Sequence, residues 1–170
     1  MTENQQPYTP LVGQHINTLL QVILERILLG LHQAGFEDIR PAHLSIFRNL
    51  IPHEIHISEL ASRAGITKAS VIYLVNDLEE RGYVERIPDA HDGRATIVQF
   101  SERGWATYEV ARGAVLQLQE EWARAVGRDE MEAFLVTLAS LASLSSSVDD
   151  AVPTSKPHPA RLRGRRHTGL

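Results

Sequence analysis

Several features that would point to a particular function class are missing from this chain of 170 residues. There is no cysteine, which excludes disulfides, thiolate zinc sites and redox sensing through a thiol. The longest apolar segment, LLQVILERILLGL, has Glu25 and Arg26 at its centre and is shorter than the ~20 residues of a membrane-spanning helix. The first residues, MTENQQPYTP, lack the basic start and apolar stretch of a secretory signal. We therefore expect a soluble cytoplasmic protein.

Motifs of the common enzyme classes are also missing. The sequence contains no Gly-x-x-x-x-Gly-Lys phosphate loop, no Gly-x-Ser-x-Gly nucleophile motif and no His-Glu-x-x-His metal motif. Its acidic residues cluster on predicted helix surfaces and at helix starts. The sequence therefore predicts a protein that is not an enzyme and needs no cofactor.

The chain has no overall excess of positive charge. Its net charge is -4, which by itself favours neither nucleic acid nor a membrane as a partner. The C-terminal segment is nevertheless basic and contains no acid, with Lys156, Arg161, Arg163, Arg165 and Arg166. We predict a flexible N-terminus over residues 1–10 and a disordered basic tail over residues 146–170.

Two short helix patterns meet at a tight turn near Gly65. The segment ISELASRAG offers Ser58 as an N-cap and Gly65 as a stop, and ITKASVIYLVNDLEERG offers Thr67 as a cap and Gly82 as a stop. The second segment has apolar residues three and four apart, at Val71, Leu74, Val75 and Leu78. This arrangement predicts a helix-turn-helix, whose second helix can enter a DNA major groove.

The pattern changes from helix to strand after Gly82. YVERI and ATIVQF are β-branched and aromatic runs of strand length, separated by the polar PDAHDGR. A hairpin directly after a helix-turn-helix predicts a winged helix with a charged wing tip. Asp89, His91 and Asp92 could also be read as metal ligands, but an exposed hairpin tip supplies few fixed ligands, so we predict no metal site.

Long amphipathic helices are predicted on both sides of this unit. Apolar residues recur three and four apart over residues 11–34, and Pro41 suits the first turn of a second helix. Ser101 is a cap for a helix of about five turns, and Asp129 is a cap for the last helix. The apolar stripes of the terminal helices exceed what one winged helix can cover, which predicts a homodimer. The predicted fold class is mainly α with a small β-hairpin.

Residues 57–104 resemble the MarR family of winged helix-turn-helix transcriptional regulators. ISELASRAGITKASVIYLVNDLEERGYVERIPDAHDGRATIVQFSERG has the family's Leu-Ala helix, recognition helix ending in Leu-Glu-x-x-Gly-Tyr/Leu-Val-x-Arg, Asp-x-x-Asp-x-Arg wing and Ser/Thr-Glu-Lys/Arg-Gly. RPAHLSIFRNL also resembles the family's second helix. The resemblance implies a MarR-like unit over 11–145, with dimerisation helices at 11–36 and 101–145 and a winged helix-turn-helix at 37–100. It further implies a homodimer that binds double-stranded DNA at a pseudo-palindromic operator, as a rule a repressor, released by a small-molecule effector.

The predicted recognition helix carries polar residues off its buried stripe. The candidates for DNA contact are Thr67, Lys68, Ser70, Tyr73 and Asn76. Hydroxyls can hydrogen-bond phosphates or base edges, Lys68 can neutralise a phosphate, and Asn76 can pair with adenine. Tyr73 stands where many family members have Arg, which puts a guanine preference at this position in doubt.

The candidates in the wing are His91, Asp92 and Arg94. Arg94 matches the family arginine that reaches the minor groove, and Asp92 is expected to brace its guanidinium. His91 stands where many relatives carry Arg, and its protonation below about pH 6.5 would add positive charge near the phosphates.

An effector pocket is expected between the dimerisation and DNA-binding parts. The candidates there are His15, His43, Phe47 and Arg48, although a satisfied structural role is the alternative for each histidine and a surface role for Arg48. Two other functions stay open: a zinc-responsive regulator using histidines, and a winged-helix module that binds protein without binding DNA. For the first, HEIH places His53 and His56 near each other, in a predicted exposed loop.

Overall fold

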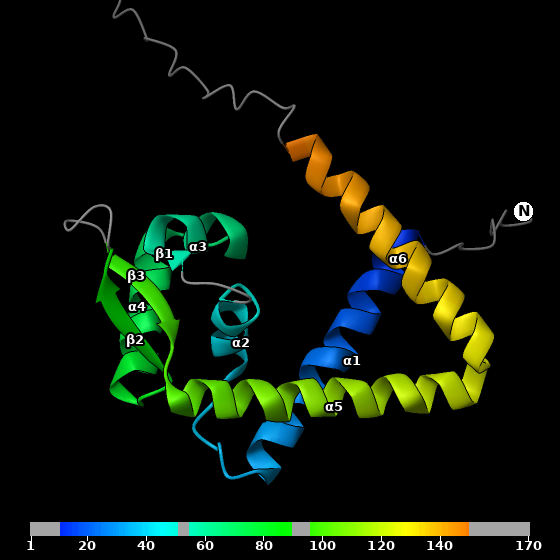
Figure 1. The fold of residues 1–170 in the computed structure, drawn as a ribbon, viewed down its shortest axis with the longest axis horizontal. Helices are drawn as coiled ribbons and strands as arrows, with labels where there is room; N and C mark the ends of the chain where they lie inside the picture. The colour runs from blue at the N-terminus through cyan, green and yellow to red at the C-terminus, as the bar shows by residue number, and fades with distance from the viewer. Residues whose placement is uncertain (1–10, 51–54, 90–95, 150–170) are drawn as a thin grey trace, which may run out of the picture. The chain divides into compact units, whose positions relative to one another are not determined.

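The computed structural model describes residues 11–50, 55–89 and 96–149. Its helices are α1 (Val12–Gln33), α2 (Pro41–Phe47), α3 (Ile57–Ala64), α4 (Lys68–Glu80), α5 (Glu102–Val126) and α6 (Arg128–Asp149). Its strands are β1 (Ile55–His56), β2 (Val84–Pro88) and β3 (Thr96–Phe100) (Figure 1). The predicted order of helices, helix-turn-helix, hairpin and two further helices is confirmed, as is the mainly α fold class.

The turn between α3 and α4 has the chemistry predicted from the sequence. Gly65 has a φ of +66° and ends α3, a conformation that costs a glycine little. Thr67 begins α4, because its Oγ1 accepts a hydrogen bond from the backbone N–H of Ser70 at 3.1 Å. Gly82, with a φ of +75°, follows the end of α4. Both ends of α4 are therefore fixed by local sequence.

The sheet has one strand more than the predicted hairpin. The antiparallel strand order is β1-β3-β2. In register, Val84 pairs with Phe100, Pro88 with Thr96, and Ile55 with Val98. The predicted loop is therefore wrong at His56, which lies in β1 opposite Ile97. A strand of two residues has too short a pattern to be found from sequence, and it exists because β3 offers a free edge.

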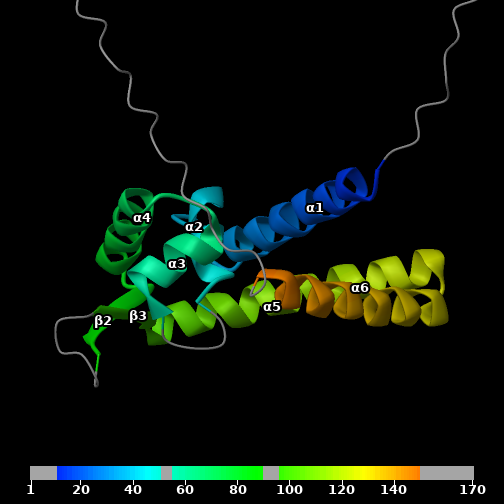
Figure 2. The ribbon, with the colours of Figure 1, turned by 90° about the horizontal axis from the view of Figure 1, so that it is seen from above.

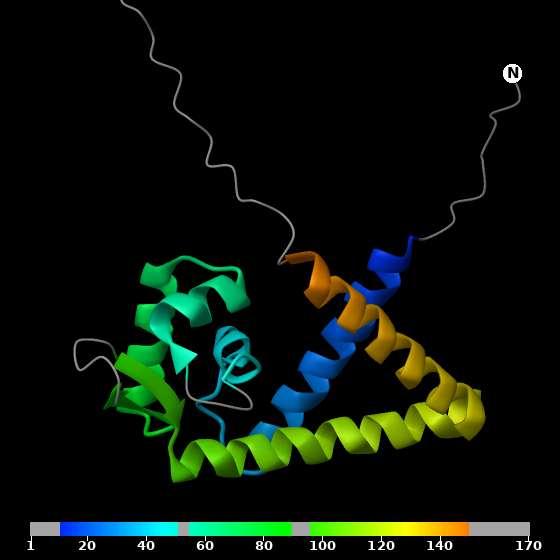
Figure 3. The same cartoon turned by 45° about the horizontal axis from the view of Figure 1, so that its top comes forward.

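The hydrophobic core joins α2, α3, α4, the sheet and the C-terminal part of α1, which the views in Figures 2 and 3 show grouped together. Leu31, Ile46, Leu60, Val75 and Val98 bring a fully buried side chain from α1, α2, α3, α4 and β3. Each such burial contributes about 1.5–3 kcal/mol. The core thus holds α4 along one side and leaves the opposite side of this helix exposed.

Helix α1 crosses α5 at a close approach (Figure 1). A Cβ placed on Gly30 would lie 3.1 Å from the Cβ of Ala114, so the two helices touch at small residues. Near the crossing, Arg26 donates two hydrogen bonds to the carboxylate of Glu121, at 2.7 and 2.9 Å. Packing and one bidentate ion pair together fix this helix pair.

Two predicted helix caps are wrong, whereas a third is confirmed. The Ser101 hydroxyl accepts a hydrogen bond from the backbone N–H of Gly104 at 3.0 Å, at the start of α5. Ser58 lies inside α3, which begins at Ile57 because β1 leads directly into it. Asp129 lies inside α6, because Gly127 takes a φ of +110° and separates α5 from α6 two residues earlier than expected.

The chain divides into a unit that runs through Trp122 and a second unit from Ala123 onward. Helices of both units leave apolar side chains exposed in the single chain. In α1 these include Val12, Ile16 and Leu20, and in α6 they include Leu135, Val136, Leu138 and Leu144. Within the described ranges, no helix is both long and apolar enough to cross a membrane.

Candidate nucleic-acid interface

All five residues that the sequence predicts to contact DNA lie on the exposed side of α4 or at its N-cap. Val71, Leu74, Val75 and Leu78 face the core. Thr67, Lys68, Ser70, Tyr73 and Asn76 are all exposed. Tyr73 is the most prominent apolar group of this side, with 64% of its surface accessible. The helix therefore presents a polar surface with one projecting aromatic ring.

Charge on this surface is concentrated at one lysine. Arg63 of α3 is bound to Glu59, with 2.6 Å between Nη2 and Oε1, and Arg86 of β2 is bound to Glu79. Lys68, in the first turn of α4, has no hydrogen bond or ion pair to another described residue. Among the described cations around α3 and α4, Lys68 is thus available to bind a phosphate without first leaving a carboxylate.

Asn76 accepts a hydrogen bond from Arg86 of the hairpin strand β2. Arg86 donates from Nη2 to Oδ1 of Asn76 and from Nη1 to Oε2 of Glu79. From sequence alone Asn76 is predicted to face a base, and its separation of ten residues from Arg86 leaves no pattern that would reveal this contact. The amide of Asn76 is therefore oriented before any DNA arrives.

The wing residues His91, Asp92 and Arg94 lie outside the described residues, as does His53. The base of the wing is described. There, His56 of β1 lies 3.1 Å from Asp89, between Nε2 and Oδ2. This contact joins the edge strand to the residue that follows β2. Sequence reasoning missed it because it considered Asp89 only with His91 and Asp92.

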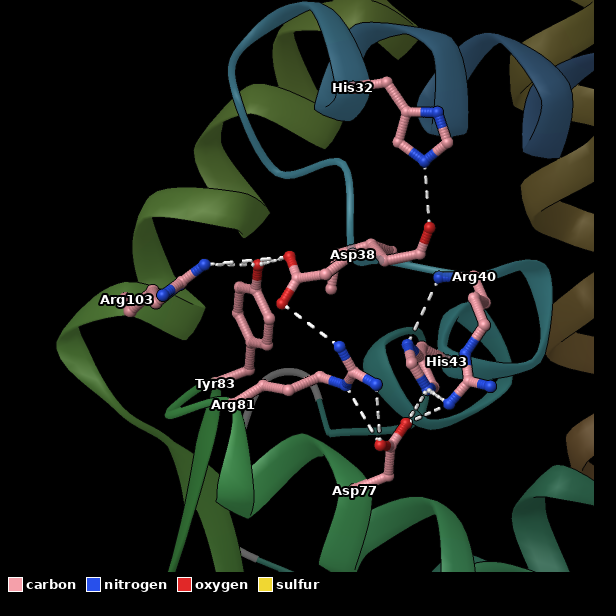
Figure 4. A network of polar contacts seen from close by, with 9 residues as sticks. His32, Asp38, Arg40, His43, Asp77, Arg81, Tyr83 and Arg103 are labelled. Carbon is pink, nitrogen blue, oxygen red and sulfur yellow. Dashed lines mark hydrogen bonds and ion pairs between the residues drawn. The ribbon is translucent and has the colours of Figure 1, made fainter.

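Behind α4, a network of polar side chains ties this helix to α2 (Figure 4). Asp77 of α4 accepts hydrogen bonds from Arg81 Nε at 3.0 Å and from His43 at 2.8 Å, and it also binds Arg40. His43 is fully buried. Its Nδ1 accepts the backbone N–H of Arg40 at 3.2 Å, so its proton sits on Nε2 and points to Asp77. His43 therefore anchors α2 to α4.

A second carboxylate extends the network to α5 (Figure 4). Asp38 accepts a hydrogen bond from the Tyr83 hydroxyl at 2.5 Å and one from Arg81 at 3.5 Å. Arg103 of α5 donates to the Tyr83 oxygen at 2.9 Å, and its guanidinium lies 4.5 Å from the ring centroid of Tyr83. Arg81 bridges Asp77 and Asp38. The start of α5 is thereby connected to the end of α4.

The network shifts the pKa values of its members. Hydrogen bonds from Arg81, opposed in part by burial and aided by Arg40 and His43, hold the pKa of Asp77 at about 2. Burial raises the pKa of Asp38, but hydrogen bonds from Tyr83 and Arg81 and the charge of Arg103 outweigh it, so the net shift is downward. Burial lowers the pKa of His43, and Arg40 and Arg81 add to this effect against the opposing pull of Asp77. His43 is thus neutral and Asp77 ionised at neutral pH.

Acid should weaken the folded state in two stages. Unfolded His43 takes up a proton near its ordinary pKa of 6.5, whereas folded His43 resists it, so its contribution to stability falls below about pH 6.5. Asp77 contributes on the order of 1–2 kcal/mol above pH 4, which is lost as the pH falls toward 2. Urea unfolding of wild type and His43→Gln from pH 5 to 8 measures the first stage. The stability advantage of wild type should shrink toward pH 5, and an advantage independent of pH would contradict the shift at His43.

A cavity of about 270 Å³ lies beside the core, within the unit that ends at Trp122. Its walls come from α1, α2, the end of β3 and α5: Leu24, Ile27, Leu44, Phe47, Arg48, Phe100, Tyr108, Ala111, Arg112, Val115 and Leu116. The structure brings the predicted pocket residues Phe47 and Arg48 together here. It does not bring His15 or His43, because His15 is exposed on α1 and His43 is bound to Asp77.

Tyr108 and Arg112 are cavity residues that the sequence analysis missed. Both lie on the same side of α5, one turn apart. In the sequence they could have been found by their four-residue spacing within the helix predicted after Ser101. The cavity is lined mainly by apolar side chains, and Arg48 and Arg112 also contribute to its walls, Arg112 with its guanidinium 3.7 Å from the carboxylate of Glu109. Such a lining suits a small apolar molecule that carries an anionic group. In the described part of the chain, no three His, Asp or Glu residues are grouped so that they could hold a metal ion.

Comparisons with known proteins agree with this arrangement. A protein-family model described as MarR family matches residues 37–95, the stretch from before α2 through the wing. The transcriptional repressor CouR, solved bound to a 23-mer DNA duplex, is similar to this chain with a TM-score of 0.59 and 25% identity, covering 78% of this chain and 92% of CouR. NadR, solved in complex with 4-hydroxyphenylacetate, has a TM-score of 0.62 at 22% identity, covering 83% of this chain and 98% of NadR.

A curated relative matches over a shorter stretch. The exopolysaccharide II synthesis transcriptional activator ExpG of Rhizobium meliloti (strain 1021) is 28% identical over 74 residues, which are 44% of this chain and 38% of ExpG. The match thus spans less than half of that protein. Residues 37–95, which include α2, the helix-turn-helix and β2, thus match the MarR family of transcriptional regulators, and the chain has the winged-helix fold of solved MarR regulators.

Proposed function

We propose that the protein is a sequence-specific DNA-binding regulator that acts as a homodimer on a pseudo-palindromic operator. The observation that carries this proposal is the exposed polar side of α4, with Lys68 available to bind a phosphate. Two-fold symmetry places the α4 helices of two protomers in successive major grooves, about 34 Å apart. CouR, which shares the fold, was solved bound to a DNA duplex, and this supports DNA binding as the function here.

Exposed apolar side chains support the homodimer. Val12, Ile16 and Leu20 of α1 lie on the surface of the single chain, and so do Leu135 and Leu138 of α6. Apolar stripes on long helices are stable in water when another helix covers them. We assign this role to a second copy of the chain, with dimerisation helices at 11–36 and 101–145.

Regulation by a small molecule is proposed from the cavity. Its position between α1, α2 and α5 means that an occupant would touch α2, which ends in the lining residue Phe47 and also carries His43, bound to Asp77 of α4. An acid with an apolar body fits the two arginines and the apolar lining. We propose that such a ligand releases the protein from DNA. We also propose repression as the sign of regulation, because the repressor CouR matches more of this chain than the activator ExpG does.

A gel shift tests the central proposal. The full-length protein and the DNA upstream of its own coding sequence are mixed at 50 and 200 mM salt, with an unrelated duplex as competitor. Specific retardation at low salt that weakens at high salt is the expected result, because phosphate contacts release counterions. No retardation at 50 mM would reject DNA binding and favour the other candidate, a winged-helix module that binds protein.

Ligand binding in the cavity should stabilise the fold. We expect 4-hydroxyphenylacetate to raise the melting temperature more than its uncharged amide, because the carboxylate can pair with Arg48 or Arg112. A ligand at 100 times its Kd contributes about 2.7 kcal/mol. Ala111→Phe should abolish the shift by filling the cavity, whereas Gly113→Ala, outside the lining, should preserve it. Trp105 lies 5.3 Å from Phe100 and 5.6 Å from Tyr108, between ring centroids, so its fluorescence gives an independent signal.

A shift that persists in Ala111→Phe would place the ligand elsewhere. Equal shifts of the melting temperature for the acid and its amide would show that Arg48 and Arg112 do not take part in ligand recognition.

A further inference from the structure

Arg86 reaches from the hairpin to the recognition helix. Strand side chains alternate between faces, and Val84 is buried on the face of β2 that packs toward the core. Arg86, two residues later, extends from the same face with 25% of its side chain accessible. Its two terminal nitrogens bind Glu79 and Asn76, three residues apart on α4. One side chain thus connects the wing strand to the side of α4 that carries the DNA-contact candidates.

The contact determines which way the Asn76 amide faces. A guanidinium has donors and no acceptor, so the amide atom that faces Arg86 is the oxygen Oδ1. The Nδ2 group is therefore turned away from Arg86. Because Asn76 is exposed, this group can donate to DNA while the oxygen is held on the β2 side.

Orientation of this amide matters for base recognition. An asparagine recognises adenine by a bidentate pair, in which Oδ1 accepts from N6 and Nδ2 donates to N7. Both amide atoms must face the base for this pair to form. Donation from Nδ2 alone can be accepted by N7 of either purine or by a phosphate oxygen, and so does not distinguish adenine from guanine.

Resting on the DNA-binding function proposed above, we propose that Arg86 is a specificity-determining positioning residue. By holding Oδ1 of Asn76, it restricts this asparagine to donating a hydrogen bond and removes the adenine selectivity that an unrestrained asparagine would bring. Arg86 itself is paired with Glu79 and does not neutralise DNA phosphate. Base selection by the third turn of α4 is thus set from the wing strand.

In vitro selection from a random duplex library, with the full-length protein, tests this proposal. Wild type and Asn76→Ala should select no adenine at the position that faces residue 76. Arg86→Met, which keeps an unbranched apolar stem and removes the donors, should gain a preference for adenine over guanine of roughly fivefold or more in each half-site. The double variant Arg86→Met with Asn76→Ala should lose this gain. Glu79→Gln leaves the bond between Arg86 and Asn76 in place and should select as wild type does.

A second, more conservative variant serves as a control in case Arg86→Met does not fold. Arg86→Lys keeps a cation for Glu79, but one ammonium group cannot reproduce the fork to Asn76. It should show the same gain of adenine preference. Thermal melting of each variant confirms that selection is measured on folded protein.

The outcomes separate this inference from the function on which it rests. Wild type that selects no sequence rejects the DNA-binding proposal itself. Wild type that selects a sequence, together with Arg86 variants that select the same one, rejects the role of Arg86. An adenine preference in wild type that Asn76→Ala abolishes also rejects it. The salt dependence gives a further check: a slope of log K against log salt lowered by about two per dimer in Arg86→Met would make Arg86 a phosphate contact.

Discussion

Replacing Gly104 by alanine should destabilise the protein by about 3 kcal/mol or more, the range expected when a methyl group is forced against fixed neighbours. A Cβ at Gly104 would lie 2.0 Å from the backbone oxygen of Tyr83 and 2.7 Å from Cδ1 of Phe100. A backbone carbonyl cannot rotate away, because Tyr83 is buried and its oxygen accepts the backbone N–H of Ser101 at 3.2 Å. The first turn of α5 would have to move off the sheet. Thermal unfolding should show a loss of about 6–12 °C.

Gly113 provides the matched control on the same helix. No atom lies within 4 Å of a Cβ placed there, so Gly113→Ala removes only the poor helix propensity of glycine. It should raise stability by about 0.5–1 kcal/mol. Equal effects at the two positions would show that helix propensity, and not the contact with Tyr83, accounts for Gly104.

Local features of this fold could be predicted from the sequence. Gly65, Thr67 and Gly82 determine the ends of α3 and α4 through their own backbone preferences and one short-range hydrogen bond. The hairpin strand β3 is visible in the sequence because TIVQF has three β-branched residues in a row and an aromatic residue at its end. These signals depend on neighbours in sequence, and the structure confirms them.

The contacts that assemble the site could not be predicted in this way. His43 binds Asp77 across 34 residues and Arg86 binds Asn76 across ten, so neither pair leaves a pattern in one chain segment. The sequence correctly predicted the helix that carries His43, and His43 was therefore expected in an effector pocket beside this helix. Which side of the helix His43 occupies, however, depends on how α2 packs against α4. The cavity draws its walls from α1, α2, β3 and α5, and tertiary packing alone brings them together.

The distribution of charge across these contacts leads to the strongest expectation for DNA binding. Nearly all arginines described near α4 are paired with a carboxylate: Arg40, Arg63, Arg81, Arg86 and Arg103. To bind phosphate, each would have to give up an existing ion pair. Lys68 has no such pair among the described residues, and it stands in the first turn of α4, where a recognition helix approaches DNA.

Lys68→Ala should therefore weaken DNA binding at least about tenfold and lower the slope of log K against log salt by about two per dimer, one for each protomer. Fluorescence anisotropy with the selected duplex, from 50 to 200 mM salt, measures both quantities. Arg63→Ala is the matched control, because Arg63 is exposed but bound to Glu59 one turn away, and its removal should leave the slope unchanged. If Arg63→Ala lowers the slope as much as Lys68→Ala does, then an internal ion pair does not prevent an arginine from binding DNA phosphate. A wild-type slope that Lys68→Ala leaves intact would instead assign the phosphate contacts to residues outside α4.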